Sequence, residues 1–295
     1  KLDLAHTMME LVLEDITRTG GPVDVVYATI RTASYAPQKL TEKLGFVKLG
    51  IFPNTHKVSE NETHCLTAFF TGESLKKRET EPKLIPEAAP FYELARRQLG
   101  LEPPVIEEVR GRYQGNPHSI PLLPMETITA PAFIRNRFKN LKCNGFFEHS
   151  YMPFHEPNLL FITPDQSTEV YLSYSQKDKY SAIVGGVTSE QDATVVLESV
   201  ARKINDMNMA YIELILDAYT PALQREAMEA RYIPSAYFPC LQRSGNRRRD
   251  CVIFSRTFEV LDFRNVKLAS LYKDYLGEYL KLWREYYIES AFRND

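Results

Sequence analysis

Apolar residues recur at helical spacing at the start of the chain, where acids and threonines separate them. This pattern predicts a helix that ends at Gly20-Gly21-Pro22; its apolar positions are Leu2, Ala5, Met9, Val12 and Ile16. The run VDVVYATI that follows is rich in β-branched residues and predicts a buried strand. A helix over residues 36–44, which ends at Gly45, and strands near 47–52 and 64–71 complete an α-β-α-β-β order.

Residues 82–131 interrupt this pattern, because nine of the 18 prolines fall there. A helix cannot continue through prolines at such spacing. We therefore predict a connector that runs over the surface and contains one short helix, in the segment APFYELARRQLGL.

The second half of the chain carries its own strand and helix signals. PNLLFIT, TEVYLSYS and YSAIVGGVT predict antiparallel strands, and TSEQDATVVLESVARKIND predicts a helix with a Thr or Ser cap. There follow a strand (MAYIELILDA), a helix (TPALQREAMEARY), another strand, a loop (QRSGNRRRD) and a last strand (DCVIFSRTF). The C-terminal stretch predicts an amphipathic helix.

An offset of 186 residues aligns the two halves without a gap. The strand VVYATI then falls on YIELIL, Gln38 on Gln224, and Cys65 on Cys251. Because apolar positions agree across two strands and one helix, we predict two copies of one fold unit.

The segment QKLTEKLGFVKLG joins a helix, a glycine and a strand in the first copy. Gly45 allows the left-handed residue that closes the helix, and Phe46 then fills the core. This ending follows a long helix, a strand and a shorter helix, and two strands close the unit. The arrangement resembles the C-terminal half of the GCN5-related N-acetyltransferase (GNAT) family. The second copy follows the same order with Arg231 in place of the glycine.

The resemblance implies an α/β (α+β) fold of two GNAT-like units, each a mixed, largely antiparallel sheet flanked by helices. Residues 1–80 would be the C-terminal half of an acyl-CoA-binding domain, 81–130 the connector, and 131–295 a degenerate second domain with a C-terminal helix. The family's pyrophosphate loop would precede Lys1, and the chain lacks a starting methionine, so we expect a fragment. Gly185-Gly186 in the second copy does not match that loop.

The resemblance also implies that acetyl-CoA, or another acyl-CoA, lies beside VVYATI. The cofactor-binding candidates are Ile30, Arg31, Ser34 and Gln38. The catalytic candidates are Tyr35 and Thr41, and Thr41 stands where the family has a proton-donating tyrosine. Tyrosines near a strand end are more often half-buried packing groups, which is the alternative for Tyr35 and Tyr27, and a helix cap or a hydrogen bond between elements explains Gln38 and Gln224 as well as a function does.

Composition narrows the function classes. A hydrophobic content of 44% with 25% charged residues is typical of a globular protein, and a net charge of −2 does not favour nucleic-acid binding. No run approaches eighteen apolar residues, so no membrane span is expected. Four cysteines without CxxC spacing favour a reducing compartment, with the cytoplasm as the default. His149, His155 and Glu156 do not form a helical metal face, so we expect no metal.

Two further sequence patterns each allow two interpretations. The arginines of RSGNRRRD fit an anion site or a solvated hairpin loop. The C-terminal aromatic stripe fits a helix that covers a sheet or a homodimer face; it consists of Leu271, Tyr275, Leu276, Tyr279, Trp283 and Tyr286.

Two functions therefore remain open. The first is an acyl-CoA-dependent N-acyltransferase that acts on a small-molecule or peptide amine. The second is a non-catalytic binding or assembly module that kept the fold and lost the chemistry. The sequence before Lys1, with or without a pyrophosphate loop, would discriminate between them.

Overall fold

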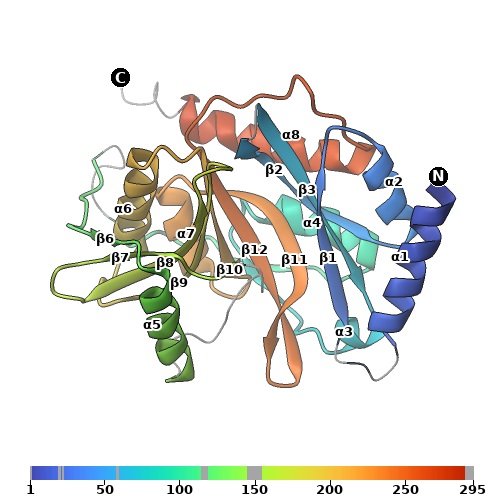
Figure 1. The fold of residues 1–295 in the computed structure, drawn as a ribbon, viewed down its shortest axis with the longest axis horizontal. Helices are drawn as coiled ribbons and strands as arrows, with labels where there is room; N and C mark the ends of the chain where they lie inside the picture. The colour runs from blue at the N-terminus through green and yellow to red at the C-terminus, as the bar shows by residue number, and fades with distance from the viewer. Residues whose placement is uncertain are drawn as a thin grey trace.

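The computed structural model describes residues 2–18, 21, 23–57, 60–113, 119–144 and 155–289. Gly20 and Pro22, which are predicted to end the first helix, and His149 lie outside these ranges. Ten strands form one sheet in the order β1-β3-β2-β11-β12-β10-β9-β8-β7-β6, and helices flank it (Figure 1). The fold is therefore mixed α/β, with a sheet that is mostly antiparallel, as predicted.

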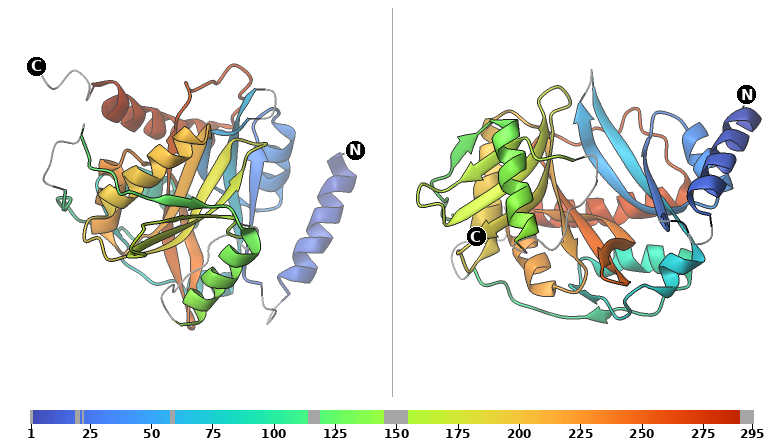
Figure 2. Two further views of the ribbon diagram at one scale, coloured as in Figure 1. Left: turned by 60° about the vertical axis from the view of Figure 1, so that its left-hand side comes forward. Right: turned by 60° about the horizontal axis from the view of Figure 1, so that its bottom comes forward.

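The first unit occupies one end of this sheet (Figures 1 and 2). Its elements follow the predicted order: α1 (Leu2–Ile16), β1 (Val25–Arg31), α2 (Ala36–Lys43), β2 (Val47–Lys57), β3 (Asn61–Phe70) and the short α3 (Gly72–Lys76). Strand β3 pairs antiparallel with both β1 and β2, so β1 is an edge strand in the described part of the chain.

The second unit has the same elements and more. It comprises β6 (Glu126–Ile128), α5 (Pro131–Cys143), β7 (Leu159–Ile162), β8 (Thr168–Ser175), β9 (Tyr180–Thr188), α6 (Ala193–Asp206), β10 (Tyr211–Asp217), α7 (Pro221–Glu229), β11 (Ile233–Ser244) and β12 (Arg247–Thr257). Strand β9 pairs with β10 in parallel over Tyr180–Ile183 only, after which no pairing continues. Helix α5 has no counterpart in the sequence prediction, and the predicted arginine loop is instead a tight hairpin whose tip holds Gly245.

The repeat extends to backbone details. Both β2 and β11 carry two register shifts, between residues 48/50 and 52/56 in the first and 234/236 and 238/242 in the second, all 186 apart. Gly45 and Arg231 both adopt positive φ (80° and 61°) after their helices. The residue after each helix turn, Phe46 or Tyr232, donates its N–H to the carbonyl of Thr41 or Ala227. The two units therefore share one backbone plan.

One alignment from the sequence is wrong. The β11–β12 hairpin is one residue longer than the β2–β3 hairpin, so the offset becomes 187 in the last strand. The β1 residue Ile30 pairs with Cys65, whereas its equivalent Leu216 pairs with Val252. Cys65 therefore corresponds to Val252, because the register of a strand pair fixes which residues are equivalent.

The sheets of the two units join where β2 lies beside β11. These strands pair at Gly50 and Ala236 only. A Cβ atom at Gly50 would lie 2.1 Å from the Cβ of Ala236, so only glycine allows this approach.

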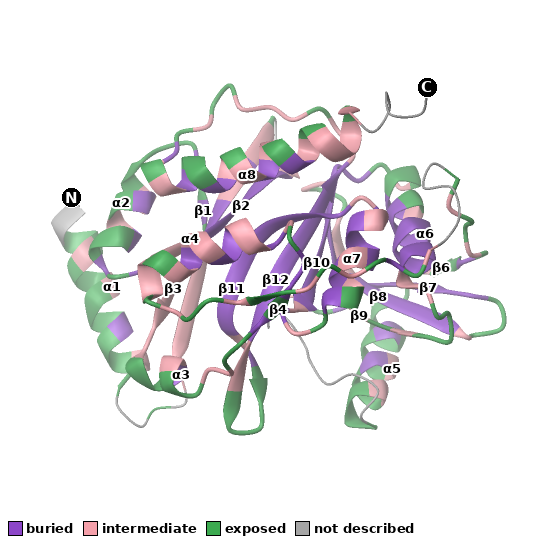
Figure 3. Cartoon of the chain, turned by 180° about the vertical axis from the view of Figure 1, so that it is seen from behind, coloured by how far each residue is buried: buried purple, intermediate pink, exposed green. Residues whose placement is uncertain are grey.

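Each unit continues into a segment that crosses this junction and is called its arm: residues 77–99 form the first arm, and residues 258–287 form the second arm. After β3 the chain passes through β4 (Lys83–Leu84) into α4 (Ala89–Leu99), and after β12 it passes through residues 258–269 into α8 (Ser270–Tyr287). Helices α4 and α8 lie side by side over β2 and β11 (Figure 3). Phe91 and Tyr92 of α4 are fully buried, so this part of the predicted surface connector belongs to the shared core. The aromatic stripe of α8 likewise covers the sheet, with Tyr275 and Tyr279 buried.

The rest of the connector has little regular secondary structure in its described residues. It contains β5 (Val105–Ile106), which pairs in parallel with β4. Among the described residues, no helix is both long and apolar enough to cross a membrane.

Candidate functional site

The predicted site residues surround the end of β1 and the start of α2. Ile30 is buried, Arg31 is exposed and bonds Glu62 (Nε–Oε2 2.7 Å), and Ser34 and Tyr35 are exposed just before α2. Thr41 is buried one turn further on, where its hydroxyl lies 3.1 Å from the carbonyl oxygens of Pro37 and Gln38. Four of the predicted site residues thus lie together, namely Ile30, Arg31, Ser34 and Tyr35. The Thr41 hydroxyl is instead bonded within α2.

Gln38 is also turned inward, and its amide holds the second arm. Its Nε2 donates to the carbonyl of Lys267 (2.6 Å), and its Oε1 accepts from the backbone N–H of Ala269 (2.9 Å). Gln224 holds the first arm in the same way, through the carbonyl of Lys83 (3.1 Å) and the N–H of Ile85 (3.3 Å). The hydrogen bond between elements that the sequence left open is therefore present in both units. The cofactor role of Gln38 stays a prediction.

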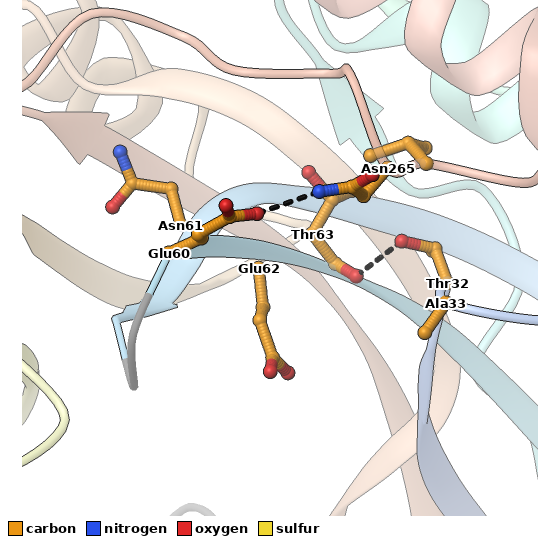
Figure 4. A pocket seen from close by; sticks show the side chains of 8 residues that line it. Thr32, Ala33, Glu60, Asn61, Glu62, Thr63 and Asn265 are labelled. Atoms are coloured by element: carbon orange, nitrogen blue, oxygen red, sulfur yellow. Dashed lines mark hydrogen bonds between the residues drawn. The ribbon is translucent and has the colours of Figure 1, made fainter.

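A pocket of about 160 Å³ lies directly beyond β1. It is formed by the end of β1, the start of β3 and the second arm, as Figure 4 shows. Its lining residues include Thr32, Ala33, Glu60, Asn61, Thr63 and Asn265. Thr32 Oγ1 donates to the Thr63 carbonyl (2.7 Å), and Asn265 Nδ2 donates to Glu60 (2.6 Å).

The equivalent place in the second unit contains protein side chains. Tyr219 stands where the first unit has Ala33, and its ring packs against Arg249 with the guanidinium carbon 4.5 Å from the ring centroid. Asp250 stands in the place of Thr63 and binds Arg78 through Nε (2.8 Å to Oδ2). Two arginines of the hairpin are thus used within the chain, since Arg248 pairs with Asp24 and Arg249 with Asp217.

The start of α6 is where the second unit would hold the pyrophosphate of acyl-CoA. Asp192 caps this helix by accepting the N–H of Thr194 (2.9 Å). The connector also passes here, because Arg112 donates to the Gln191 carbonyl (2.6 Å) and pairs with Glu226 (3.3 Å).

The same connector presses against a second carboxylate. A Cβ atom at Gly111 would lie 1.7 Å from an oxygen of Glu229, so the backbone of this segment touches the carboxylate. Burial raises the pKa values of Glu226 and Glu229. A helix N-terminus binds phosphate through free N–H groups and positive potential. These acids and the connector do not fit a pyrophosphate at the start of α6.

A further group of titratable side chains lies where the units meet. The His56 ring stacks on Tyr180 (centroid distance 5.1 Å) and lies 4.7 Å from His64. The Tyr180 and Tyr211 hydroxyls both donate to Glu213, at 2.6 and 3.0 Å.

Glu213 is the most perturbed acid of this group. Burial raises its pKa to about 7, although the two tyrosine hydrogen bonds act in the opposite direction. Burial also lowers the pKa of His64 to about 4. Sequence analysis missed Glu213, and the available signal was a single carboxylate inside the apolar strand YIELILD. Among the described residues, no group of His, Cys, Asp or Glu side chains could hold a metal ion.

Comparisons with known proteins find solved structures that are similar to parts of this chain. No protein-family model and no curated protein sequence matches this chain. Similar solved structures include the ribosomal-protein-S18-alanine N-acetyltransferase from Escherichia coli, at 11% identity and a TM-score of 0.32, which covers 50% of this chain and 95% of that one. Another is a GNAT-family acetyltransferase, assigned as probable, from Chromobacterium violaceum, at 13% identity and a TM-score of 0.34, covering 53% and 94%.

A third structure was solved with acetyl-CoA as its cofactor. It is a Salmonella typhimurium protein proposed to be an acetyltransferase, at 9% identity and a TM-score of 0.34, covering 47% of this chain and 98% of that one. The element order and strand pairing described above carry the assignment: the chain has a GNAT-like fold in two units that share one sheet.

Proposed function

We propose that this protein is an acyl-CoA-dependent N-acyltransferase whose reacting centre lies in the first unit, at the end of β1. One contrast carries the proposal. In the second unit Tyr219 stands at the end of β10 with its ring against Arg249, whereas a pocket lies at the end of β1. Backbone N–H and C=O groups along a strand can pair with an extended ligand.

The residues of the first unit can be given roles on this basis. The thioester of acyl-CoA would supply the electrophilic carbonyl carbon. The backbone at Ile30 and Arg31 would bind the pantetheine chain along the edge of β1, and Ser34 and Tyr35 would contact its reactive end. The acceptor amine must lose a proton before it attacks. Glu60 lines the pocket and is the carboxylate that can take it, since Glu62 is held by Arg31.

A small-molecule or peptide amine is the acceptor in this proposal. Cys65, Cys143, Cys240 and Cys251 are all free thiols. Free thiols are typical of a reducing compartment, so we place the reaction in the cytoplasm.

The test uses the natural full-length protein. Titration calorimetry should detect acetyl-CoA binding, and thiol release should appear when a panel of primary amines is added. Ser34→Tyr should lower kcat/KM at least about 100-fold, because the ring would occupy the reactive end. Thr220→Tyr is the matched control, since this exposed residue holds the equivalent position in the second unit and should leave activity unchanged.

One observation favours the second candidate function, a non-catalytic binding or assembly module. The Thr41 hydroxyl, which replaces the proton-donating tyrosine of the family, is buried and bonded within α2. A bound ligand at 100 times its Kd stabilises a protein by about 2.7 kcal/mol. If acetyl-CoA gives no thermal shift and no amine releases thiol, the module is supported and the enzyme is excluded.

A further inference from the structure

Helix α5 carries a local concentration of positive charge. Four of its 13 residues are Arg or Lys, and it is the only described helix without an Asp or Glu. One of the four, Arg137, binds Glu169 of the neighbouring strand β8 (Nε–Oε2 2.8 Å). The other three are exposed: Arg135, Lys139 and Lys142. The net charge of −2 for the whole chain therefore conceals a basic surface.

The residues of α5 fall into rows, because side chains three or four positions apart lie on one face of a helix. One row is apolar and packs against β7, β8 and β9; it consists of Ile134, Phe138 and Leu141. The second row holds the three exposed cations. The third row is also exposed and consists of Phe133, Asn136 and Asn140. The exposed side of α5 therefore presents cations, amides and one aromatic ring.

Two cations of the second row are open to a partner. Arg135 lies 3.8 Å from Glu156, but both side chains are exposed, and such surface pairs contribute little. No ion pair of Lys139 is found among the described residues. Helix α5 lies beside β7 at the end of the sheet away from β1, so this row is distant from the pocket beyond β1 (Figure 1).

The residue types of the two exposed rows discriminate between anionic partners. A membrane-bound helix needs a free apolar face, but the apolar row of α5 is occupied by the sheet. The core of a protein–protein interface is apolar and poor in Lys, whereas the exposed rows hold a single large apolar side chain, Phe133. A nucleic-acid strand matches all the residue types, because Arg, Lys and Asn bind phosphates and an unpaired base stacks on an aromatic ring.

We infer that the exposed side of α5 binds single-stranded nucleic acid. With a rise of about 1.5 Å per residue, Arg135 and Lys142 are about 10 Å apart along the helix axis. A stacked strand advances about 3.4 Å per nucleotide, so the row of cations spans about three phosphates. The half-exposed ring of Phe133 is the platform for one base. This inference goes beyond the proposed function and does not depend on it.

The test uses the natural full-length protein and fluorescein-labelled strands of uridine or thymidine nucleotides. Fluorescence anisotropy should show saturable binding of at least one strand at low salt. Three phosphate contacts give a slope of about −2 in log K against log salt, so the affinity should fall about 20-fold between about 50 and 200 mM. A preference for the uridine strand would show contacts to the 2′-hydroxyl. No saturable binding, or binding that salt does not weaken, would overturn the inference.

Two other anionic probes test the alternative partners. A labelled polyglutamate peptide and vesicles that contain phosphatidylserine should each bind at least about tenfold more weakly than the strands, because neither offers a base to stack on Phe133. Tighter binding of the peptide than this would identify an acidic protein as the partner, and tighter binding of the vesicles a membrane. Either result rejects nucleic acid.

Substitutions on α5 locate the surface. The double variant Arg135→Gln with Lys139→Gln should weaken strand binding at least about tenfold and reduce the salt slope by about 1.4, since each phosphate contact contributes about 0.7. Phe133→Ala should weaken binding about tenfold without changing the slope, because it removes stacking but no charge. Unchanged affinity in both variants would reject the surface.

The matched control removes the same charge from another helix. Lys273 and Lys281 are exposed on α8, where acidic residues lie between them. Lys273→Gln with Lys281→Gln should leave the affinity unchanged, and unaltered melting temperatures show that all the variants fold. Equal losses in the two double variants would mean that total charge rather than α5 decides binding, and would exclude the inferred site.

Discussion

The ends of β1 and β10 have the same backbone and opposite chemistry. Arg31 ends β1 and pairs with Glu62 of β3, whereas Asp217 ends β10 and pairs with Arg249 of β12. The ion pair is thus kept with its charges exchanged. Around it, the first unit has small residues and unpartnered oxygens, and the second has Tyr219 and the Arg78–Asp250 pair. A repeated fold can therefore preserve an interaction while one copy loses its space for a ligand.

The largest effect should come from the position that differs most between the copies. Asp250→Asn leaves the buried guanidinium of Arg78 without its counter-ion and should lower the free energy of unfolding by about 4 kcal/mol. Thr63→Val at the equivalent position should change it by less than about 0.5 kcal/mol. Urea unfolding of both variants measures this difference, and equal costs would show that the two sites are energetically alike.

Glu213, which is buried where the two units meet, should make the free energy of unfolding depend on pH. Because its pKa is raised to about 7 from an ordinary 4.5, the folded state keeps a proton that the unfolded state releases between these values. Stability from this group is therefore full at low pH and falls as pH rises, by about 3 kcal/mol between pH 5 and 8.

Glu213→Gln should remove that slope, as measured by urea unfolding at several pH values. Asp206→Asn, at an exposed carboxylate, should retain it. Parallel pH profiles for the wild type and Glu213→Gln would contradict the assignment.

The two glutamines that hold the arms should behave alike. Gln38→Ala and Gln224→Ala each remove two hydrogen bonds to an arm and should cost about 1 to 2 kcal/mol of unfolding free energy. The double variant should show the sum, since separate sites add. Lys39→Ala on the exposed side of α2 serves as the control, and a cost in only one copy would show that the arms are held differently.

The smallest effect concerns the residue after each short helix. Gly45 and Arg231 share a left-handed conformation, which costs a non-glycine residue about 1 kcal/mol. Gly45→Ala should therefore lower the melting temperature by a few degrees, and Arg231→Gly should not lower it. A shift in the same direction for both would mean that backbone strain does not decide these positions.

Much of the fold was predictable because its signals are local. The strands TEVYLSYS and YSAIVGGVT have the bounds that their sequence patterns predict, and the helix predicted in APFYELARRQLGL ends two residues before that segment does. The repeat was also visible, since apolar positions at a fixed offset reflect the same buried faces. Helix α5 was missed, because polar residues are spread through its sequence, PAFIRNRFKNLKC, and only Ile134 and Phe138 are buried.

The candidate site was predictable only in part. The sequence pattern located Ile30, Arg31, Ser34 and Tyr35 at one strand end, where the structure places them together. It did not reveal that Thr63 and Asn265 meet there, because these residues are far apart in the chain. Nor did it show that Gln38 holds a distant arm or that the Thr41 hydroxyl is buried and bonded within α2, since burial on a short helix depends on the elements packed against it.

The sequence by itself determined the periodicity of each element, the glycine that closes α2 and the existence of two copies, since these depend on neighbouring residues. The tertiary structure decided which copy keeps a pocket, how the arms cross and where Glu213 is buried. These outcomes depend on contacts between distant residues, such as Gly50 with Ala236 and Arg78 with Asp250. The segments LTEKLGF and EAMEARY thus specify the same turn in the two copies, while long-range packing specifies which side chains surround the end of each strand.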